Sequence, residues 1–169
     1  YLDGPFLIAA LKRPFSFVAK AELNKQFIAG TFLRSIQTEF VERFDAKKGV
    51  EDIQRIAQTE NKNRSLFFFP EGTFTRTPGL SSFHLGAFLT AAELGLPVGP
   101  IAIRGTRSIL RANSTRPNRG VIRIVIGKPI HIHEFTQDEK IDSWSTALSL
   151  RDAAREHILR HCVEPDLDR

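Results

Sequence analysis

Short apolar runs alternate along this chain with segments whose apolar residues recur at helical spacing. The run at residues 66–69 predicts a buried strand, and residues 143–162 predict an amphipathic helix. Further strands are expected at 15–20, 38–43, 98–104, 121–127 and, as a short extended piece, 130–133, and further helices at 4–12, 21–35, 51–60 and 83–94. Strands that alternate with helices are typical of a largely parallel sheet. We therefore expect an α/β fold with a mostly parallel central sheet flanked by helices.

The strand at residues 66–69 ends in a turn that carries a carboxylate. Pro70 has no N–H to donate to a sheet, and Gly72 can adopt backbone conformations that other residues resist. Ligand sites of α/β proteins lie at such strand ends, because backbone N–H groups there face a crevice. The same residues also end ordinary buried strands. At this point a ligand site and a plain strand end are both open.

Residues 69–73, Phe-Pro-Glu-Gly-Thr, resemble the phosphate-site motif of the glycerophospholipid acyltransferases, the family that includes lysophosphatidic acid acyltransferase. Residues 1–4 resemble the second half of that family's His-x-x-x-x-Asp motif. Further segments resemble later blocks of the family in the same order: 17–20 with 22–23, 40–43 and 97–105. The resemblance spans nearly the whole chain and implies a glycerol-3-phosphate acyltransferase-like fold.

The resemblance implies that Asp3 is the carboxylate of the His-x-x-x-x-Asp motif and that the motif's His lies just before Tyr1. Imidazole would take the proton of the attacking hydroxyl, and Asp3 would hold its tautomer. Asp3 cannot itself be the base, because a carboxylate with an ordinary pKa of about 3.9 is too weak. The other reading of Asp3 is an acid at a helix N-terminus. We expect residues 1–169 to be a single acyltransferase domain cut from a longer protein, and inactive without that His.

Arg43 is the first candidate to bind the acceptor phosphate, because a guanidinium offers two parallel donors to phosphate oxygens. The amides of Gly72 and Thr73, with the Thr73 hydroxyl, would complete the phosphate site. Glu71 is expected to orient Arg43 or another cation, or to accept from backbone amides in the turn, and not to touch phosphate directly. Further candidates for substrate binding are Arg76, Lys20 and Arg104.

Each of these arginines and lysines has another interpretation. Arg43 could pair with Glu42 or Asp45 on the surface, and Lys20 and Arg104 could be plain surface charges. The family commonly has Arg directly after Glu-Gly-Thr, where this chain has Phe74, so Arg76 is its nearest substitute.

The implied activity is transfer of a fatty acyl group from acyl-CoA or acyl carrier protein to a lysophospholipid or glycerol-phosphate hydroxyl in phospholipid biosynthesis. The resemblance points to a 1-acyl-glycerol-3-phosphate O-acyltransferase-like enzyme that needs neither a metal nor a bound cofactor. The alternative is a non-catalytic module that binds phospholipid headgroups or an anionic partner. A residue upstream of Tyr1 that cannot accept a proton would favour the alternative.

Composition suits these expectations. The 169 residues are 41% hydrophobic and 25% charged, and 24 Lys plus Arg against 19 Asp plus Glu give a net charge of +5, which favours anionic partners. Six arginines are concentrated in residues 104–123, but the stretch lacks the aromatic residues of a nucleic-acid platform, so nucleic acid is not expected as a partner. No run approaches the ~20 apolar residues of a membrane span. We expect peripheral attachment to the inner face of the membrane in the cytoplasm.

The single cysteine, Cys162, excludes an internal disulfide and suits a reducing compartment. His131 and His133 share one side of an extended run, as metal ligands do, but Glu134 is the only acid nearby. Surface histidines are the preferred interpretation, and no metal site is predicted.

Overall fold

The computed structural model describes residues 3–11, 14–20, 38–41, 65–73, 75, 77–110, 114, 116–135 and 142–168. The chain divides into two compact units: one is Lys12–Pro70, and the other joins Tyr1–Leu11 to Glu71–Arg169. The helices expected at 21–35 and 51–60 lie outside the described residues, as do Arg43 and Arg76.

The unit Lys12–Pro70 contains a parallel sheet of three strands, β1 (Phe15–Lys20), β2 (Glu39–Val41) and β3 (Ser65–Phe67), in the order β2-β1-β3. Both pairings are parallel, with Val18 opposite Glu39 and Phe15 opposite Ser65. The expected parallel arrangement is therefore confirmed for these strands.

Four phenylalanines of β1, β3 and the residues that directly follow β3 form one ring cluster. The rings of Phe15, Phe17, Phe67 and Phe69 contact one another, with centroids 5.1 to 5.9 Å apart. Neighbouring side chains in a strand point to opposite faces, and Val18 accordingly packs with Leu66 and Phe68 in a separate cluster. Apolar side chains of β1 and of residues 66–69 thus lie on both faces of this strand pair.

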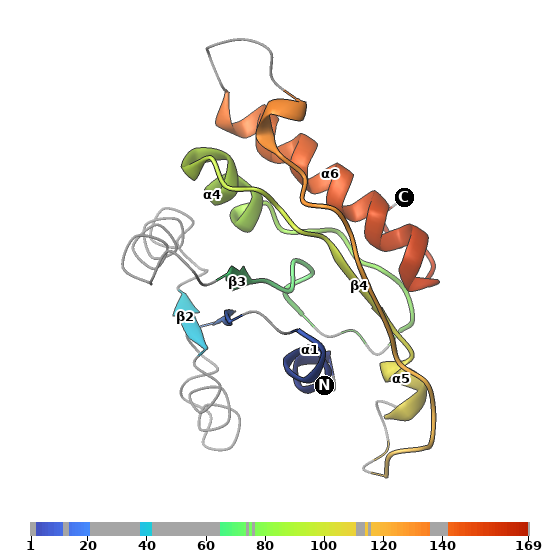
Figure 1. Ribbon diagram of the computed structural model, residues 1–169. Coiled ribbons are helices and arrows are strands. Elements are labelled where there is room, and N and C mark those ends of the chain that lie inside the picture. Colours follow the sequence, from blue (N-terminus) through green and yellow to red (C-terminus); the bar gives the residue numbers. More distant parts are fainter. Residues whose placement is uncertain are drawn as a thin grey trace. The chain divides into compact units, whose positions relative to one another are not determined.

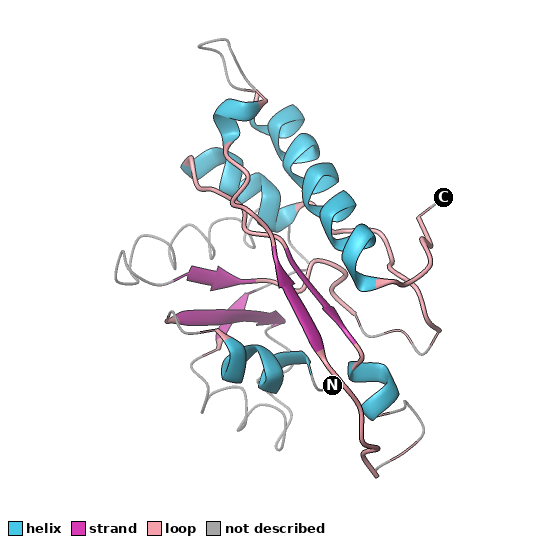
Figure 2. Ribbon diagram, turned by 45° about the vertical axis from the view of Figure 1, so that its right-hand side comes forward, coloured by secondary structure: helices cyan, strands magenta, loops and turns pink. Residues whose placement is uncertain are grey.

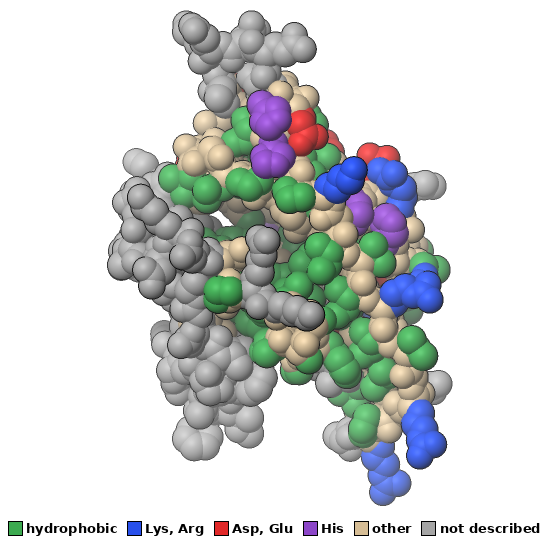
Figure 3. Space-filling model, in the orientation of Figure 1, with side chains coloured by type: hydrophobic (Ala, Val, Ile, Leu, Met, Phe, Trp, Pro, Cys, Tyr) green, Lys and Arg blue, Asp and Glu red, His purple; other side chains and the backbone are tan. Residues whose placement is uncertain are grey.

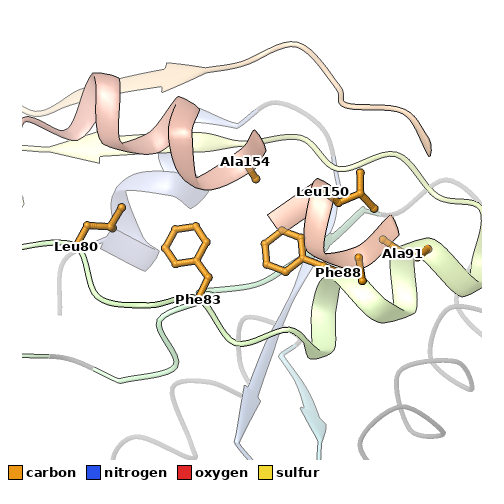
Figure 4. Close-up of a cluster of buried hydrophobic side chains, with 8 residues drawn as sticks. Leu80, Phe83, Phe88, Ala91, Leu150 and Ala154 are labelled. Carbon is orange, nitrogen blue, oxygen red and sulfur yellow. The ribbon is translucent and has the colours of Figure 1, made fainter. Parts of the chain in front are cut away.

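The second unit contains α1 (Asp3–Ala10), α4 (Gly86–Leu94), β4 (Ile101–Arg104), α5 (Thr106–Ile109), β5 (Arg123–Ile126), the 3₁₀ turn η2 (Ile132–Glu134) and α6 (Ser143–Cys162). Helix α6 packs against α4 and β4 (Figure 1). Its apolar stripe supplies Ala147, Leu150 and Ala154 to a core that includes Phe83 and Phe88 (Figure 4). No helix in the described part of the chain is long and apolar enough to cross a membrane.

The ends of α4 and α6 follow from local chemistry. The Asp142 carboxylate accepts from the amides of Ser145 and Trp144, at 3.1 and 3.3 Å, and so caps α6. These hydrogen bonds, that of Ser145 first, lower the pKa of Asp142. Helix α4 ends at Gly95 with φ of 68°, the left-handed conformation predicted for a glycine at that end. Helix α6 ends at Val163, which adopts the same conformation with φ of 61°.

The strand at β4 departs from the expected parallel arrangement. Its partner is β5, and the two run antiparallel, with Ile101 opposite Ile126 and Arg104 opposite Arg123 (Figure 2). A parallel neighbour requires a crossover, usually through a helix. In its described residues, the connection between β4 and β5 contains the four-residue helix α5 and no longer helix, and it returns the chain alongside β4.

The extended piece expected at 130–133 is also only partly correct. Ile130 exchanges two backbone hydrogen bonds with Val98, of 2.8 and 2.9 Å, and so is extended. From Ile132 the chain turns into η2, because Glu134 reaches back to the His131 amide at 2.8 Å. The rings of His131 and His133 lie 5.1 Å apart, centroid to centroid.

Candidate functional site

The Pro-Glu-Gly-Thr turn adopts the geometry that its glycine predicts. Gly72 has φ of 67°, in the left-handed region that favours glycine. The Glu71 carboxylate accepts a hydrogen bond of 2.9 Å from the Ser81 amide, ten residues further along the chain. This bond joins the start of the loop to its end. The amide lies outside the turn in which backbone partners for Glu71 were expected. Thr73 is exposed, so its hydroxyl is accessible to a ligand.

Arg107 of α5 holds the middle of the same loop. Its Nη1 donates to the Thr75 carbonyl at 3.1 Å, and its Nε lies 3.7 Å from Glu164 Oε1. Sequence reasoning counted Arg107 only among the basic residues of 104–123. The contact joins residues 32 positions apart, so no local pattern indicates it.

Asp3 is the first residue of α1 and is half-buried. The unpaired N–H groups at a helix N-terminus favour a carboxylate there. Helix α1 is anchored by Leu7, which is buried in the same unit as the turn at Glu71 to Thr73. The position suits both interpretations of Asp3, the motif carboxylate and the helix-terminal acid.

The remaining candidates are distributed more widely. Arg104 is the last residue of β4, half-buried and paired across the strands with Arg123. Lys20 is the last residue of β1, opposite Val41 in the other unit. The structure thus brings Glu71, Gly72 and Thr73 together in one turn and places Arg104 at the end of a different strand pair.

An apolar groove of about 420 Å³ begins on the helix that carries Asp3. It is lined by side chains of α1 and of the segments around β5, namely Phe6, Ala9, Ala10, Ile109, Gly120, Ile122 and Ile124. Sequence reasoning did not identify it. Its signals are the apolar run 6–10 and the β-branched run 122–126, but nothing in either run shows that they meet.

His157 of α6 is a titratable group without a hydrogen-bond partner among the described residues. Its Nε2 is inaccessible to solvent, and the ring packs against Gly127, the residue after β5. The His161 ring lies 4.4 Å away, centroid to centroid. Burial first, then the charges of His161 and Arg160, lower the pKa of His157.

The lowered pKa of His157 predicts a loss of stability in mild acid. Below about pH 6.5 the unfolded chain protonates this histidine while the folded protein resists, so the free energy of unfolding should fall as the pH drops through that range. The free energy of unfolding, measured in urea, should differ less between pH 7.5 and pH 5.5 in His157→Phe than in the unaltered protein. His133→Phe, at an exposed histidine, is the matched control. An equal pH dependence in the unaltered protein and His157→Phe would contradict the assignment.

Known proteins resemble this chain in sequence. The Acyltransferase family model matches residues 1–104. The chloroplastic 1-acyl-sn-glycerol-3-phosphate acyltransferase LPAT1 of Arabidopsis thaliana is 34% identical over 127 residues, covering 75% of this chain and 36% of that protein. Lysophosphatidylcholine acyltransferase 1 of Rattus norvegicus is 36% identical over 113 residues, covering 65% of this chain and 20% of that protein.

A solved structure agrees in fold. The crystal structure of the 1-acyl-sn-glycerophosphate acyltransferase PlsC from Thermotoga maritima superposes with a TM-score of 0.56 at 21% identity, covering 92% of this chain and 61% of that chain. This match supports a mixed α/β fold with helices and a small parallel sheet. The chain spans 36% and 20% of the length of the two sequence relatives named above.

The family model covers more than half of the chain, including Asp3, the turn at Glu71 to Thr73 and Arg104. The relatives are named as 1-acyl-sn-glycerol-3-phosphate and lysophospholipid acyltransferases, so the resemblance drawn from residues 69–73 is confirmed. This chain belongs to the Acyltransferase family.

Proposed function

We propose that the protein transfers a fatty acyl group from acyl-CoA or acyl carrier protein to the hydroxyl of a lysophospholipid or glycerol phosphate, as a 1-acyl-glycerol-3-phosphate O-acyltransferase-like enzyme. The proposal is carried by the geometry of the turn in a chain that belongs to the Acyltransferase family. Glu71 is hydrogen-bonded to the Ser81 amide, and Gly72 adopts a left-handed backbone conformation. We propose that the Glu71 carboxylate, which already accepts from the Ser81 amide, does not contact the phosphate. The adjacent amides and the Thr73 hydroxyl are then the groups that suit a phosphate.

The chemistry needs a base for the acceptor hydroxyl. The hydroxyl oxygen attacks the thioester carbonyl carbon, the new C–O bond forms as the C–S bond breaks, and the hydroxyl proton passes through the base to the leaving thiolate. We propose that the base is an imidazole on the residue that the family motif places before Tyr1. Asp3 would fix its tautomer and stabilise the imidazolium that forms during attack.

Binding of the acceptor phosphate involves fixed cations as well as the turn. We propose Arg43 as the principal cation, with Arg76, Lys20 and Arg104 as further contributors, because guanidinium and ammonium groups give short charge-assisted hydrogen bonds to phosphate. A phosphate fixed by several donors holds the acceptor hydroxyl near the base, and such positioning lowers the barrier by several kcal/mol.

The acyl chain requires an apolar site. We propose that the groove lined by Phe6, Ile109 and Ile122 accommodates part of it, since α1 carries both this groove and Asp3. Burying a methylene from water contributes about 0.8 kcal/mol. The groove therefore favours a long-chain donor or acceptor over a short one.

We also propose peripheral attachment to the cytoplasmic face of an anionic membrane. Arg116, Arg119 and Arg123 are exposed, and Val121 between them is 80% exposed. Basic side chains stand at the lower right of Figure 3, where Figure 1 places α5 and the loop that follows it. Each basic residue near an anionic lipid surface contributes about 1 kcal/mol.

Thiol release by the full-length protein tests the proposal. With acyl-CoA as donor and a panel of lysophospholipids and glycerol 3-phosphate as acceptors, we expect release that depends on the acceptor. Arg43→Ala should raise the acceptor KM by about 10- to 100-fold, since hydrogen bonds to a charged group are worth roughly 1.5–3 kcal/mol, and should leave the donor KM unchanged.

The control is Arg160→Ala, which removes an exposed arginine that pairs with Glu156 at 3.2 Å on α6. It should change neither KM. Equal effects of Arg43→Ala on both substrates would count against a phosphate role for Arg43. Headgroup binding without acceptor-dependent thiol release would favour the non-catalytic alternative.

A further inference from the structure

The last described residues of the chain are hydrogen-bonded to the end of the loop that carries the Pro-Glu-Gly-Thr turn. The Leu80 amide donates to the Pro165 carbonyl at 2.8 Å, and the Leu167 amide donates to the Leu80 carbonyl at 3.0 Å. Gly79 permits this approach, because a Cβ there would overlap the Leu167 side chain. The segment from Val163 to Asp168, here called the C-terminal segment, thus runs alongside Leu80.

Arg155 of α6 contacts both the C-terminal segment and Leu80. Its Nη2 donates to Asp166 Oδ1 at 2.6 Å and to the Leu80 carbonyl at 3.2 Å. Its guanidinium also lies 5.8 Å from the centre of the Phe83 ring. The Arg155 side chain is only 11% exposed, so water replaces these partners poorly. One guanidinium therefore binds the C-terminal segment, the end of the loop and the core.

Ser81, which follows Leu80, connects this part of the chain to the turn. Ser81 donates its amide to Glu71 Oε2 at 2.9 Å, and Glu71 directly precedes Gly72 and Thr73. Arg107 makes a second link, from Thr75 in the loop to Glu164 in the C-terminal segment. The loop is thus connected to the C-terminal segment at its middle and at its end.

We propose that Arg155 and Asp166 are positioning residues for phosphate recognition: they fix Leu80 and Ser81, and through the Ser81–Glu71 hydrogen bond they set the orientation of the Gly72 and Thr73 amides. The inference rests on the proposed function, since those amides are the groups assigned to the acceptor phosphate. It gives a role in substrate recognition to a carboxylate that follows α6, outside the residues matched by the family model.

Kinetics of the full-length protein with acyl-CoA and lysophosphatidic acid give the first test. Asp166→Ala should raise the acceptor KM by about 10- to 100-fold, because a displacement of about 1 Å at a positioning element has effects of this size. The donor KM should stay unchanged. Asp166→Asn, which keeps an acceptor oxygen for Arg155, should recover most of the acceptor affinity. Glu156→Ala, at an exposed pair on the same helix, is the control.

Amide hydrogen exchange gives a second readout that does not depend on turnover. In Asp166→Ala the amides of residues 71–81 should exchange at least several-fold faster, while the α4 amides stay protected. Should Asp166→Ala not fold, Asp168→Ala provides a milder change, since Asp168 Oδ2 lies 3.6 Å from Arg155 Nε.

The results of these experiments distinguish a failure of the proposed function from a failure of the positioning role. If the unaltered protein releases no thiol with any acceptor, the proposed function fails and the inference fails with it. If the unaltered protein is active but the variants change both KM values equally, or leave exchange at residues 71–81 unaltered, the positioning role alone is overturned.

Discussion

Replacing Asp3 by Asn in the full-length protein is expected to lower kcat by on the order of 10²- to 10⁴-fold while leaving both KM values nearly unchanged. Asn has the shape of Asp but no charge, so it cannot stabilise an imidazolium, and its NH₂ group favours the wrong imidazole tautomer. Asp3 lies at the N-terminus of α1, and loss of its charge there should reduce helix stability by no more than about 1 kcal/mol. Steady-state thiol release measures the rate loss, and thermal unfolding measures the stability.

The matched control for Asp3→Asn is Asp152→Asn. The Asp152 side chain is exposed and pairs only at the surface with Arg151 at 2.8 Å among its described contacts, so kcat should be retained. The interpretation of Asp3 as a helix-terminal acid predicts a different result. It requires a small loss of stability and a kcat close to that of the unaltered protein.

Leu150→Ala should lower the free energy of unfolding by about 2–5 kcal/mol, the range for a buried leucine truncated without collapse of its surroundings. Leu150 is 0% exposed and belongs to the core cluster formed by α6, α4 and the segment from Leu80 to Phe83 (Figure 4). Urea unfolding, with extrapolation to zero denaturant, measures the change.

Leu96→Ala is the control for Leu150→Ala, because it makes the same truncation at a leucine that is 43% exposed. Its effect should stay within about 1 kcal/mol. Similar losses for the two variants would contradict the assignment of Leu150 to the core that holds α6 against α4.

Two elements with a strong local pattern could be predicted to the residue, whereas the strand expected at 66–69 is Ser65–Phe67. Strand β1 occupies residues 15–20, and α6 occupies residues 143–162, as expected from the apolar pattern. The direction of β5 could not be predicted, because it depends on how residues 105–122 return the chain and not on the pattern within the strand. Helix α4 begins at Gly86 and not at residue 83. Phe83 precedes the helix and is buried in the core.

In the candidate site, too, the local turn could be predicted and the long-range contacts could not. The motif at residues 69–73 indicated Glu71 and the left-handed Gly72, because a turn is determined by residues close in sequence. The hydrogen bonds from Arg107 to Thr75 and from Arg155 to Leu80 join residues 32 and 75 positions apart. Such contacts depend on the packing of α5 and α6, so the sequence contains no local signal for them.

Val163, where α6 ends, carries a conformational cost in the folded chain. A β-branched residue in a left-handed conformation costs roughly 1–2 kcal/mol, which glycine at the same place avoids. The side chain is largely solvent-facing, so little packing is sacrificed by its removal. The junction between α6 and the C-terminal segment is therefore a place where the folded chain gives up stability that a glycine would retain.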